Sequence, residues 1–205
     1  ANACGTGFSN VNGSIHDFTA KNCTTTGLVI QGGDATRGIV IGTTGNNINI
    51  AADYSSLRDV VSYGATGGSG HGVVLAGGID TCIFVNVISY NNSQQNYQDA
   101  DGTQRMNMLV NCAGGAGGVA DTVLAVCKEN FITLTADPFT NAAGNDFSLN
   151  NIAGGGLALK ALAYPPSYLG LSTSSYGDVG AAQHQDTVVG GPPARSMIVQ
   201  GIGTY

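Results

Sequence analysis

Short apolar runs separated by turn-forming residues are the dominant pattern of the first two thirds of the chain. Gly27–Ile30, Gly38–Ile41 and Gly72–Leu75 are glycine-led apolar triplets, and Met108–Val110 is a plausible fourth copy. Ile48-Asn49-Ile50 adds the alternation typical of a half-buried strand. The pattern predicts many short strands and almost no helix.

A second repeated unit has a polar residue, two apolar or β-branched residues, a small residue, a longer one and then Asn or Gly. It occurs at 17–22, 59–64 and 86–91, with spacings of 42 and 27 residues. Unequal spacing predicts turns of unequal length. Asn22 and Asn91, which end two of the copies, are expected in stacked ladders at the corners, since Asn tolerates left-handed backbone.

These units exclude a sandwich of long alternating strands, and no amphipathic helices lie between them for βαβ units. They predict a solenoid with three strands per turn, each turn burying its inward side chains against the next. Over residues 10–135 the pattern resembles the pectate-lyase-like superfamily, which implies an all-β, right-handed parallel β-helix. Near the other end, 178–183 resembles the strand that often closes such domains in exported bacterial and phage-associated proteins.

Two insertions interrupt the repeat, at 64–72 and 93–104. The second has no apolar run, and we expect it to lie outside the core.

The C-terminal third has a different pattern. Residues 137–139 and 145–149 are expected as two extended pieces that cross the end of the solenoid, and 157–163 as a short helical cap before a pair of prolines. We therefore predict one β-helix domain over 1–189 and an extended C-terminal arm over 190–205. The arm is expected to dock on a neighbouring subunit or to fold back on its own solenoid, through Met197, Ile198, Val199 and Tyr205.

The composition limits which classes of partner the protein can bind. Only 10% of the 205 residues are charged and the net charge is −6, so no basic patch is available for nucleic acid. No apolar run is long enough for a transmembrane helix. The chain begins at Ala1 without a methionine, which indicates a removed segment or a fragment of a longer protein.

The five cysteines lack zinc-site spacing. Cys4 with Cys23, or Cys82 with Cys112, are expected to stack in neighbouring turns, or to serve as buried small apolar residues.

The resemblance implies two chemistries, a lyase with Asp-bound calcium and an Arg base, or a hydrolase with paired aspartates. The best candidates are Asp99, Asp101 and Arg105 in the long insertion, where the two aspartates could also hold calcium. The alternative is an ordinary solvated turn. Asp53, Arg58 and Asp59 form a second candidate cluster, although Asp59 also fits a corner position.

Two other residue types could bind or react. Tyr63 and Tyr90 occupy the same repeat position, so their rings could stack and bind sugar, or stiffen the solenoid. His71 could be an acid or base, or a turn residue that leads into a strand.

With one Glu and seven basic residues the chain offers little material for an enzyme site. The sequence therefore favours a non-catalytic structural or adhesive module, extracellular or on a virion surface, such as a phage decoration, fibre or tail protein or a bacterial surface protein. We expect it to assemble as a homo-oligomer or with neighbouring structural subunits, to need no cofactor, and to make at most a glycan contact. The alternatives are a polysaccharide lyase or glycoside hydrolase that acts on an acidic glycan, with possible calcium, and a carbohydrate-binding module.

Overall fold

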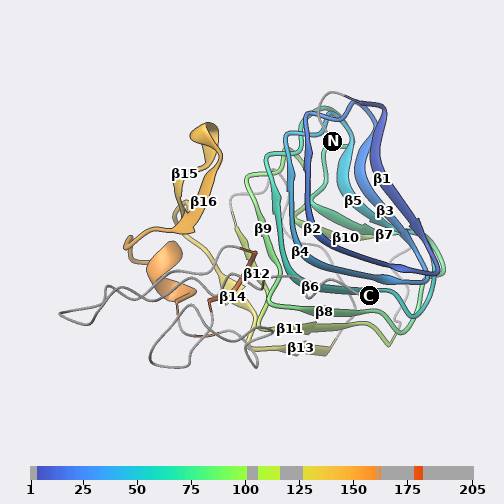
Figure 1. The fold of residues 1–205 in the computed structure, drawn as a ribbon. Helices are drawn as coiled ribbons and strands as arrows, with labels where there is room; N and C mark the ends of the chain where they lie inside the picture. Colours follow the sequence, from blue (N-terminus) through green and yellow to red (C-terminus); the bar gives the residue numbers. More distant parts are fainter. Residues whose placement is uncertain (1–3, 101–105, 116–126, 161, 163–177, 182–205) are drawn as a thin grey trace, which may run out of the picture.

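The computed structural model describes residues 4–100, 106–115, 127–160, 162 and 178–181. These residues form a parallel β-solenoid of about five turns (Figure 1). The fold class is therefore the one that the repeat pattern predicts. Among the described residues no helix is long and apolar enough to cross a membrane.

The first sheet forms one side of the solenoid, and its neighbouring strands are parallel. In stacking order its strands are β1 (Thr6–Val11), β3 (Thr26–Gln31), β5 (Asn46–Ile50), β7 (Val73–Leu75) and β10 (Tyr97–Asp99).

The second sheet forms the other two sides, which are continuous in the early turns and divided in the later ones. The continuous strands are β2 (Ser14–Lys21), β4 (Asp34–Ile41) and β6 (Ser56–Tyr63). The divided strands are β8 (Ile83–Val85) with β9 (Ile88–Tyr90), β11 (Met108–Val110) with β12 (Ala113–Gly115), and β13 (Cys127–Glu129) with β14 (Ile132–Thr133).

One column of left-handed residues makes the bend between these two sides. The column is Asp17, Arg37, Asp59, Asn86, Asn111 and Asn130, with φ between 48° and 55°. Asn and Asp adopt this conformation at lower cost than other side chains, which explains why five of the six positions carry them. A second column, Asn22, Gly42, Gly64 and Asn91, forms the next corner. Asn22 and Asn91 are thus corner residues as predicted, separated by two glycine corners.

The register explains the repeat spacing. Thr19, Ile39, Val61 and Ile88 are successive partners, so 17–22, 59–64 and 86–91 do stack. The 42-residue spacing between the first two copies contains one more turn of the solenoid. Its equivalent segment is 37–42, which the sequence interpretation missed.

The four apolar triplets are not equivalent in the structure. Gly27–Ile30 and Gly72–Leu75 belong to the first sheet, whereas Gly38–Ile41 and Met108–Val110 lie in the second. Gly38 is needed for another reason, since a Cβ there would lie 2.0 Å from the Phe18 ring. This glycine makes room for an aromatic side chain of the preceding turn.

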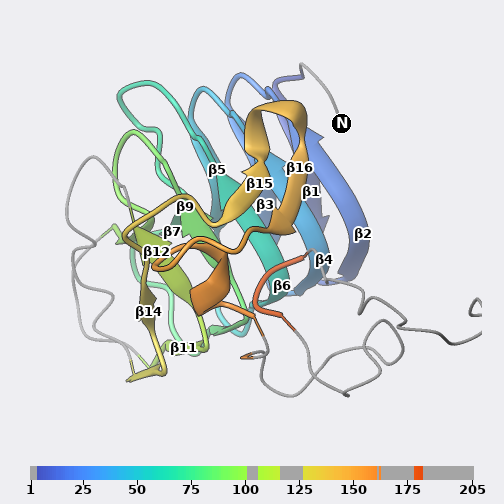
Figure 2. The same cartoon turned by 90° about the vertical axis from the view of Figure 1, so that its left-hand side faces the viewer.

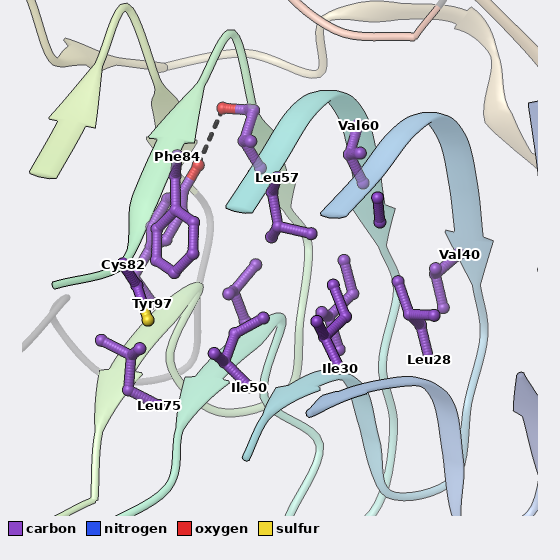
Figure 3. Packing of buried hydrophobic residues seen from close by; sticks show 14 of the residues in the cluster. Leu28, Ile30, Val40, Ile50, Leu57, Val60, Leu75, Cys82, Phe84 and Tyr97 are labelled. Carbon is purple, nitrogen blue, oxygen red and sulfur yellow. Dashed lines mark hydrogen bonds between the residues drawn. The ribbon is translucent and has the colours of Figure 1, made fainter. Parts of the chain in front are cut away.

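The interior is filled by inward side chains of all three sides, which stack from turn to turn (Figure 3). Leu28 and Ile48 are successive partners of one column, and Ile30, Ile50 and Leu75 of the next. In the same buried cluster, Ile50 and Leu75 face Leu57 and Phe84, which come from the opposite side of the solenoid (Figure 3). Burial of each such side chain contributes roughly 1.5–3 kcal/mol.

The expectation that 93–104 lies outside the core is wrong for its middle part. Tyr97–Asp99 is strand β10, and Tyr97 is only 2% exposed. Its hydroxyl lies 2.8 Å from the Val87 carbonyl oxygen and 3.0 Å from that of Ala113. A single inward aromatic ring with a hydrogen-bonded hydroxyl fills this turn without an apolar run.

A β-hairpin covers the outside of the second sheet. It consists of β15 (Phe139–Asn141) and β16 (Asp146–Leu149), paired antiparallel. The predicted piece 145–149 is therefore confirmed as strand β16 except for Asn145, whereas 137–139 contributes only Phe139, the first residue of β15. The hairpin lies along the side of the solenoid (Figure 2) and not across its end. Its strands bury a second apolar cluster between the hairpin and the outer face of the sheet.

The expected helical cap is also wrong. Of residues 157–163, the structure describes 157–160 and 162, and the only helical turn is the 3₁₀ turn Gly156–Ala158. The Asn150 side chain accepts hydrogen bonds from the backbone N–H groups of Ile152 and Gly156, which fixes a turn where the sequence favours helix. The C-terminal arm, 190–205, lies outside the described residues.

Candidate functional site

The aromatic pair predicted from the repeat is present on the outer face of the second sheet. Tyr63 and Tyr90 are partners in β6 and β9, and their rings stack with centroids 6.3 Å apart and planes 22° apart. The Tyr63 hydroxyl donates to Asp137 Oδ2 at 2.9 Å, and Asn91 Nδ2 donates to that hydroxyl at 3.3 Å.

The hairpin packs over this pair. The rings of Phe139 and Phe147 each lie 5.6 Å edge-to-face from Tyr63, and Tyr90 is only 6% exposed. Burial, followed by the hydrogen bond to Asp137, raises the pKa of Tyr63 to about 12. The two rings are thus part of the packing between the second sheet and the hairpin. Sugar binding by this pair stays a prediction.

An ion pair joins the first two residues of the bend column, Asp17 of the first turn and Arg37 of the second. Arg37 donates to Asp17 through both Nε and a terminal nitrogen, at 2.6 and 2.7 Å, and His16 Nδ1 lies 2.9 Å from the same carboxylate. Arg37 and then His16 hold the pKa of Asp17 well below its usual range. The pairing was missed because the partners lie 20 residues apart in sequence; the in-register repeat 17, 37, 59 was the available signal.

In the third turn the bend column holds a buried acid. Asp59 is 1% exposed and accepts a hydrogen bond from Asn86 Nδ2 at 2.8 Å. Burial raises its pKa to about 6, although Asn86, Arg58 and Arg37 each act in the opposite direction. This environment agrees with the corner position that the repeat assigns to Asp59, and it leaves the carboxyl almost no contact with solvent.

The described part of 178–183 runs beside this acid. Gly180 N donates to the Asn86 carbonyl oxygen at 3.0 Å, and Asp178 and Val179 are fully buried. A Cβ at Gly180 would lie 2.6 Å from Ile88, which explains the glycine. Residues 178–181 are not a strand in the structure, so the resemblance to a closing strand is wrong for the residues described.

The other candidate residues are not brought together by the described structure. Asp99 ends β10, whereas Asp101 and Arg105 lie outside the described residues. The Asp53 carboxylate accepts from the Asp80 N–H at 2.7 Å, as a turn residue does. His71 precedes β7 and its Nδ1 accepts from Gln95 N at 3.3 Å, while burial lowers its pKa.

The search for a metal site concerns only the residues that the structure describes. Over those residues, no group of three or more His, Cys, Asp or Glu side chains could hold a metal ion. A calcium site at Asp99 and Asp101 stays a prediction, because only Asp99 is described.

A polar network inside one corner was not predicted. Asn47 Nδ2 lies 3.1 Å from Ser62 Oγ and 3.2 Å from Asn92 Oδ1, and Asn92 Nδ2 donates to Asn96 Oδ1 at 2.8 Å. All four side chains are buried. Because unpaired amides would be costly there, the network fixes how these turns stack.

Comparison with known proteins gives no relative: no protein-family model, no curated protein and no solved structure matches this chain. Its class is therefore defined by its own geometry, as a parallel β-solenoid with a side-covering hairpin.

Proposed function

We propose that this protein is a rigid, non-catalytic structural or adhesive module. The observation that carries the proposal is the hairpin over the tyrosine pair: the aromatic rings, with Asp137, are used for internal packing. Asp59 is likewise enclosed, and Asp17 is paired with Arg37. A fold that uses these groups internally supplies shape and stiffness.

The proposed setting is the outside of a cell or particle, as a phage decoration, fibre or tail component or a bacterial surface protein. The solenoid pattern supports this, since it resembles the pectate-lyase-like superfamily. Low charge and 32 glycines suit a scaffold that packs against neighbours. Assembly is proposed to use the C-terminal arm, whose Met197, Ile198 and Val199 form an apolar run.

Molar mass in solution tests the proposal. Light scattering is measured over a range of concentrations for the full chain, for a chain that ends at Val189, and for a full chain with Met197, Ile198 and Val199 replaced by Ser. The full chain is expected to be an oligomer and both variants monomers. A full chain that is monomeric at every concentration would overturn assembly through the arm.

Glycan cleavage provides the opposing test. The proposal expects the full chain to leave acidic polysaccharides intact. Cleavage that disappears in the Asp99→Asn/Asp101→Asn double variant would instead establish the enzyme alternative.

A further inference from the structure

We propose that Cys4 and Cys23 form a disulfide when the protein is in an oxidising environment, and that this bond fastens the first turn of the solenoid to the second. The two sulfur atoms lie 3.0 Å apart across neighbouring turns. The inference is independent of the proposed function, because it depends only on the geometry of these two turns.

The backbone brings the two residues together. Strands β1 and β3 are parallel partners that begin in register at Thr6 and Thr26. The hydrogen bonds continue before the strands: Thr24 N donates to the Cys4 carbonyl oxygen at 2.7 Å, and Thr25 N to that of Gly5 at 2.9 Å. This register places Cys4 opposite Thr24, so Cys23 is its diagonal neighbour. A strand spacing of about 4.8 Å and a rise of about 3.3 Å per residue give a diagonal of about 5.8 Å, which is inside the roughly 4.4–6.8 Å between Cα atoms that a disulfide spans.

Only a small side-chain movement is then needed. A disulfide bond is about 2.05 Å long, so the sulfurs must approach by roughly 1 Å, which rotation about the Cα–Cβ bonds supplies. Gly7 contributes to the space, because a Cβ at that position would lie 3.1 Å from Cys23 Sγ.

The other three cysteines have different surroundings. The Cys82 thiol lies near the carbonyl oxygens of Ala52 and Asp80, at 3.7 and 3.5 Å. Cys112 is fully buried, and burial raises its pKa to about 12. Cys127 is exposed. Cys82 and Cys112, which the sequence suggested as a stacked pair, thus bond to backbone carbonyls at different positions.

The bond can form by exchange with a small-molecule disulfide such as oxidised glutathione. Cys4 is partly exposed and Cys23 is fully buried, so the Cys4 thiolate is the one that such a molecule reaches. It displaces one glutathione thiolate and forms a mixed disulfide. The Cys23 thiolate then attacks the Cys4 sulfur and displaces the remaining glutathione. Two protein thiols are oxidised, one glutathione disulfide is reduced to two thiols, and the protons are taken up by those products.

The bond would protect the end of the solenoid where strand pairing stops. Within the described residues β1 pairs on one side only, with β3, and an unpaired strand edge invites fraying and association with other chains. A link from residue 4 to residue 23 closes a loop that contains the whole first turn. It therefore restricts the unfolded chain as well as the frayed one.

Peptide mapping tests the inference directly. The full chain is incubated with oxidised glutathione, blocked with an alkylating agent and digested with trypsin, which cuts after Lys21 and Arg37. We expect a linked pair of peptides, 1–21 and 22–37, with the buried Cys82 and Cys112 still alkylated. Oxidation should also raise the thermal midpoint by several degrees, reversibly on reduction.

The variants separate this bond from other thiol chemistry. Cys4→Ser should lose both the linked peptides and the rise in midpoint, whereas Cys127→Ser should retain both. Unlinked 1–21 and 22–37 peptides after oxidation, or a link between any other pair of cysteines, would overturn the inference. This readout on the unsubstituted chain does not depend on the folding of any variant.

Discussion

At the scale of single residues, Asp59 is the position where burial and charge conflict most. Its carboxyl is 1% exposed, and its pKa lies at about 6 instead of the ordinary 3.8 because burial disfavours the charged form. The folded protein therefore binds this proton more tightly than the unfolded chain does. It follows that ionisation of Asp59 costs stability, which is lost as the pH rises from about 4 to about 6.

Asp59→Asn is expected to stabilise the protein at neutral pH. Asn already occupies the same corner at positions 86, 111 and 130, so the left-handed backbone is retained. Relative to wild type, the variant should gain on the order of 2–3 kcal/mol at pH 7 and nothing at pH 3, since a pKa difference of one corresponds to about 1.4 kcal/mol. Denaturant unfolding between pH 3 and pH 8 measures the difference.

Asp17→Asn is the matched control at the first position of the same column. Asp17 is exposed and paired with Arg37, and its pKa is depressed, so its charge stabilises the fold above the unfolded pKa. This variant should lose stability at pH 7 and lose nothing at low pH. A pH-independent effect of Asp59→Asn would contradict the role assigned to burial.

At the scale of elements, the strands and corners were more predictable than the contacts between distant segments. The repeats at 17–22, 59–64 and 86–91 identify the corners because Asn, Asp and Gly are needed for left-handed backbone. The in-register stack of Tyr63 on Tyr90 follows from the same repeat. Strand β10 could not be predicted from periodicity, since its burial depends on one tyrosine between polar residues.

The position of the hairpin over the second sheet was missed for a related reason. A sheet covered on one face alternates apolar and polar residues, whereas a sheet covered on both faces has continuous apolar runs. Gly38–Ile41 is such a run, and Ile39 and Ile41 belong to the cluster under the hairpin. The sequence therefore indicates that this side is covered, but nothing in it identifies the hairpin at 139–149 as the cover.

Phe147→Ala is expected to weaken the hairpin. Phe147 is 3% exposed and lies 4.9 Å from the Phe139 ring and 5.6 Å from Tyr63. Loss of a buried aromatic ring costs about 3–5 kcal/mol, measurable by denaturant unfolding. Absorbance titration should show the pKa of Tyr63 falling from about 12 toward its ordinary 10 as burial is reduced.

Leu157→Ala is the control for this variant. Its side chain is 52% exposed, so the change should alter stability by less than about 0.5 kcal/mol. An equal loss in both variants would show that the hairpin contributes no specific packing.

At the scale of the whole molecule, the hairpin changes how a solenoid is expected to unfold. In repeat proteins each turn contacts only its neighbours, so the ends can open while the middle remains folded. Here the hairpin contacts consecutive turns at once: Asn145 accepts a hydrogen bond from Lys21 in the first turn, and Phe139 and Phe147 cluster with Ile41, Tyr63 and Tyr90 in the next three. Opening the first turns therefore removes contacts that the later turns share.

Hydrogen exchange of the reduced protein should reveal this coupling. In the wild type, amides in the second halves of β2, β4 and β6 are expected to exchange with a common opening free energy, because the hairpin joins their turns. In Phe147→Ala the profile should become graded, with β2 opening first and β6 last, as in an uncovered solenoid. The first halves of β2 and β4, which carry the Asp17–Arg37 pair and have no residue in the cluster under the hairpin, provide an internal comparison. If the wild type already shows the graded profile, the hairpin is a local cover and not the element that makes the solenoid cooperative.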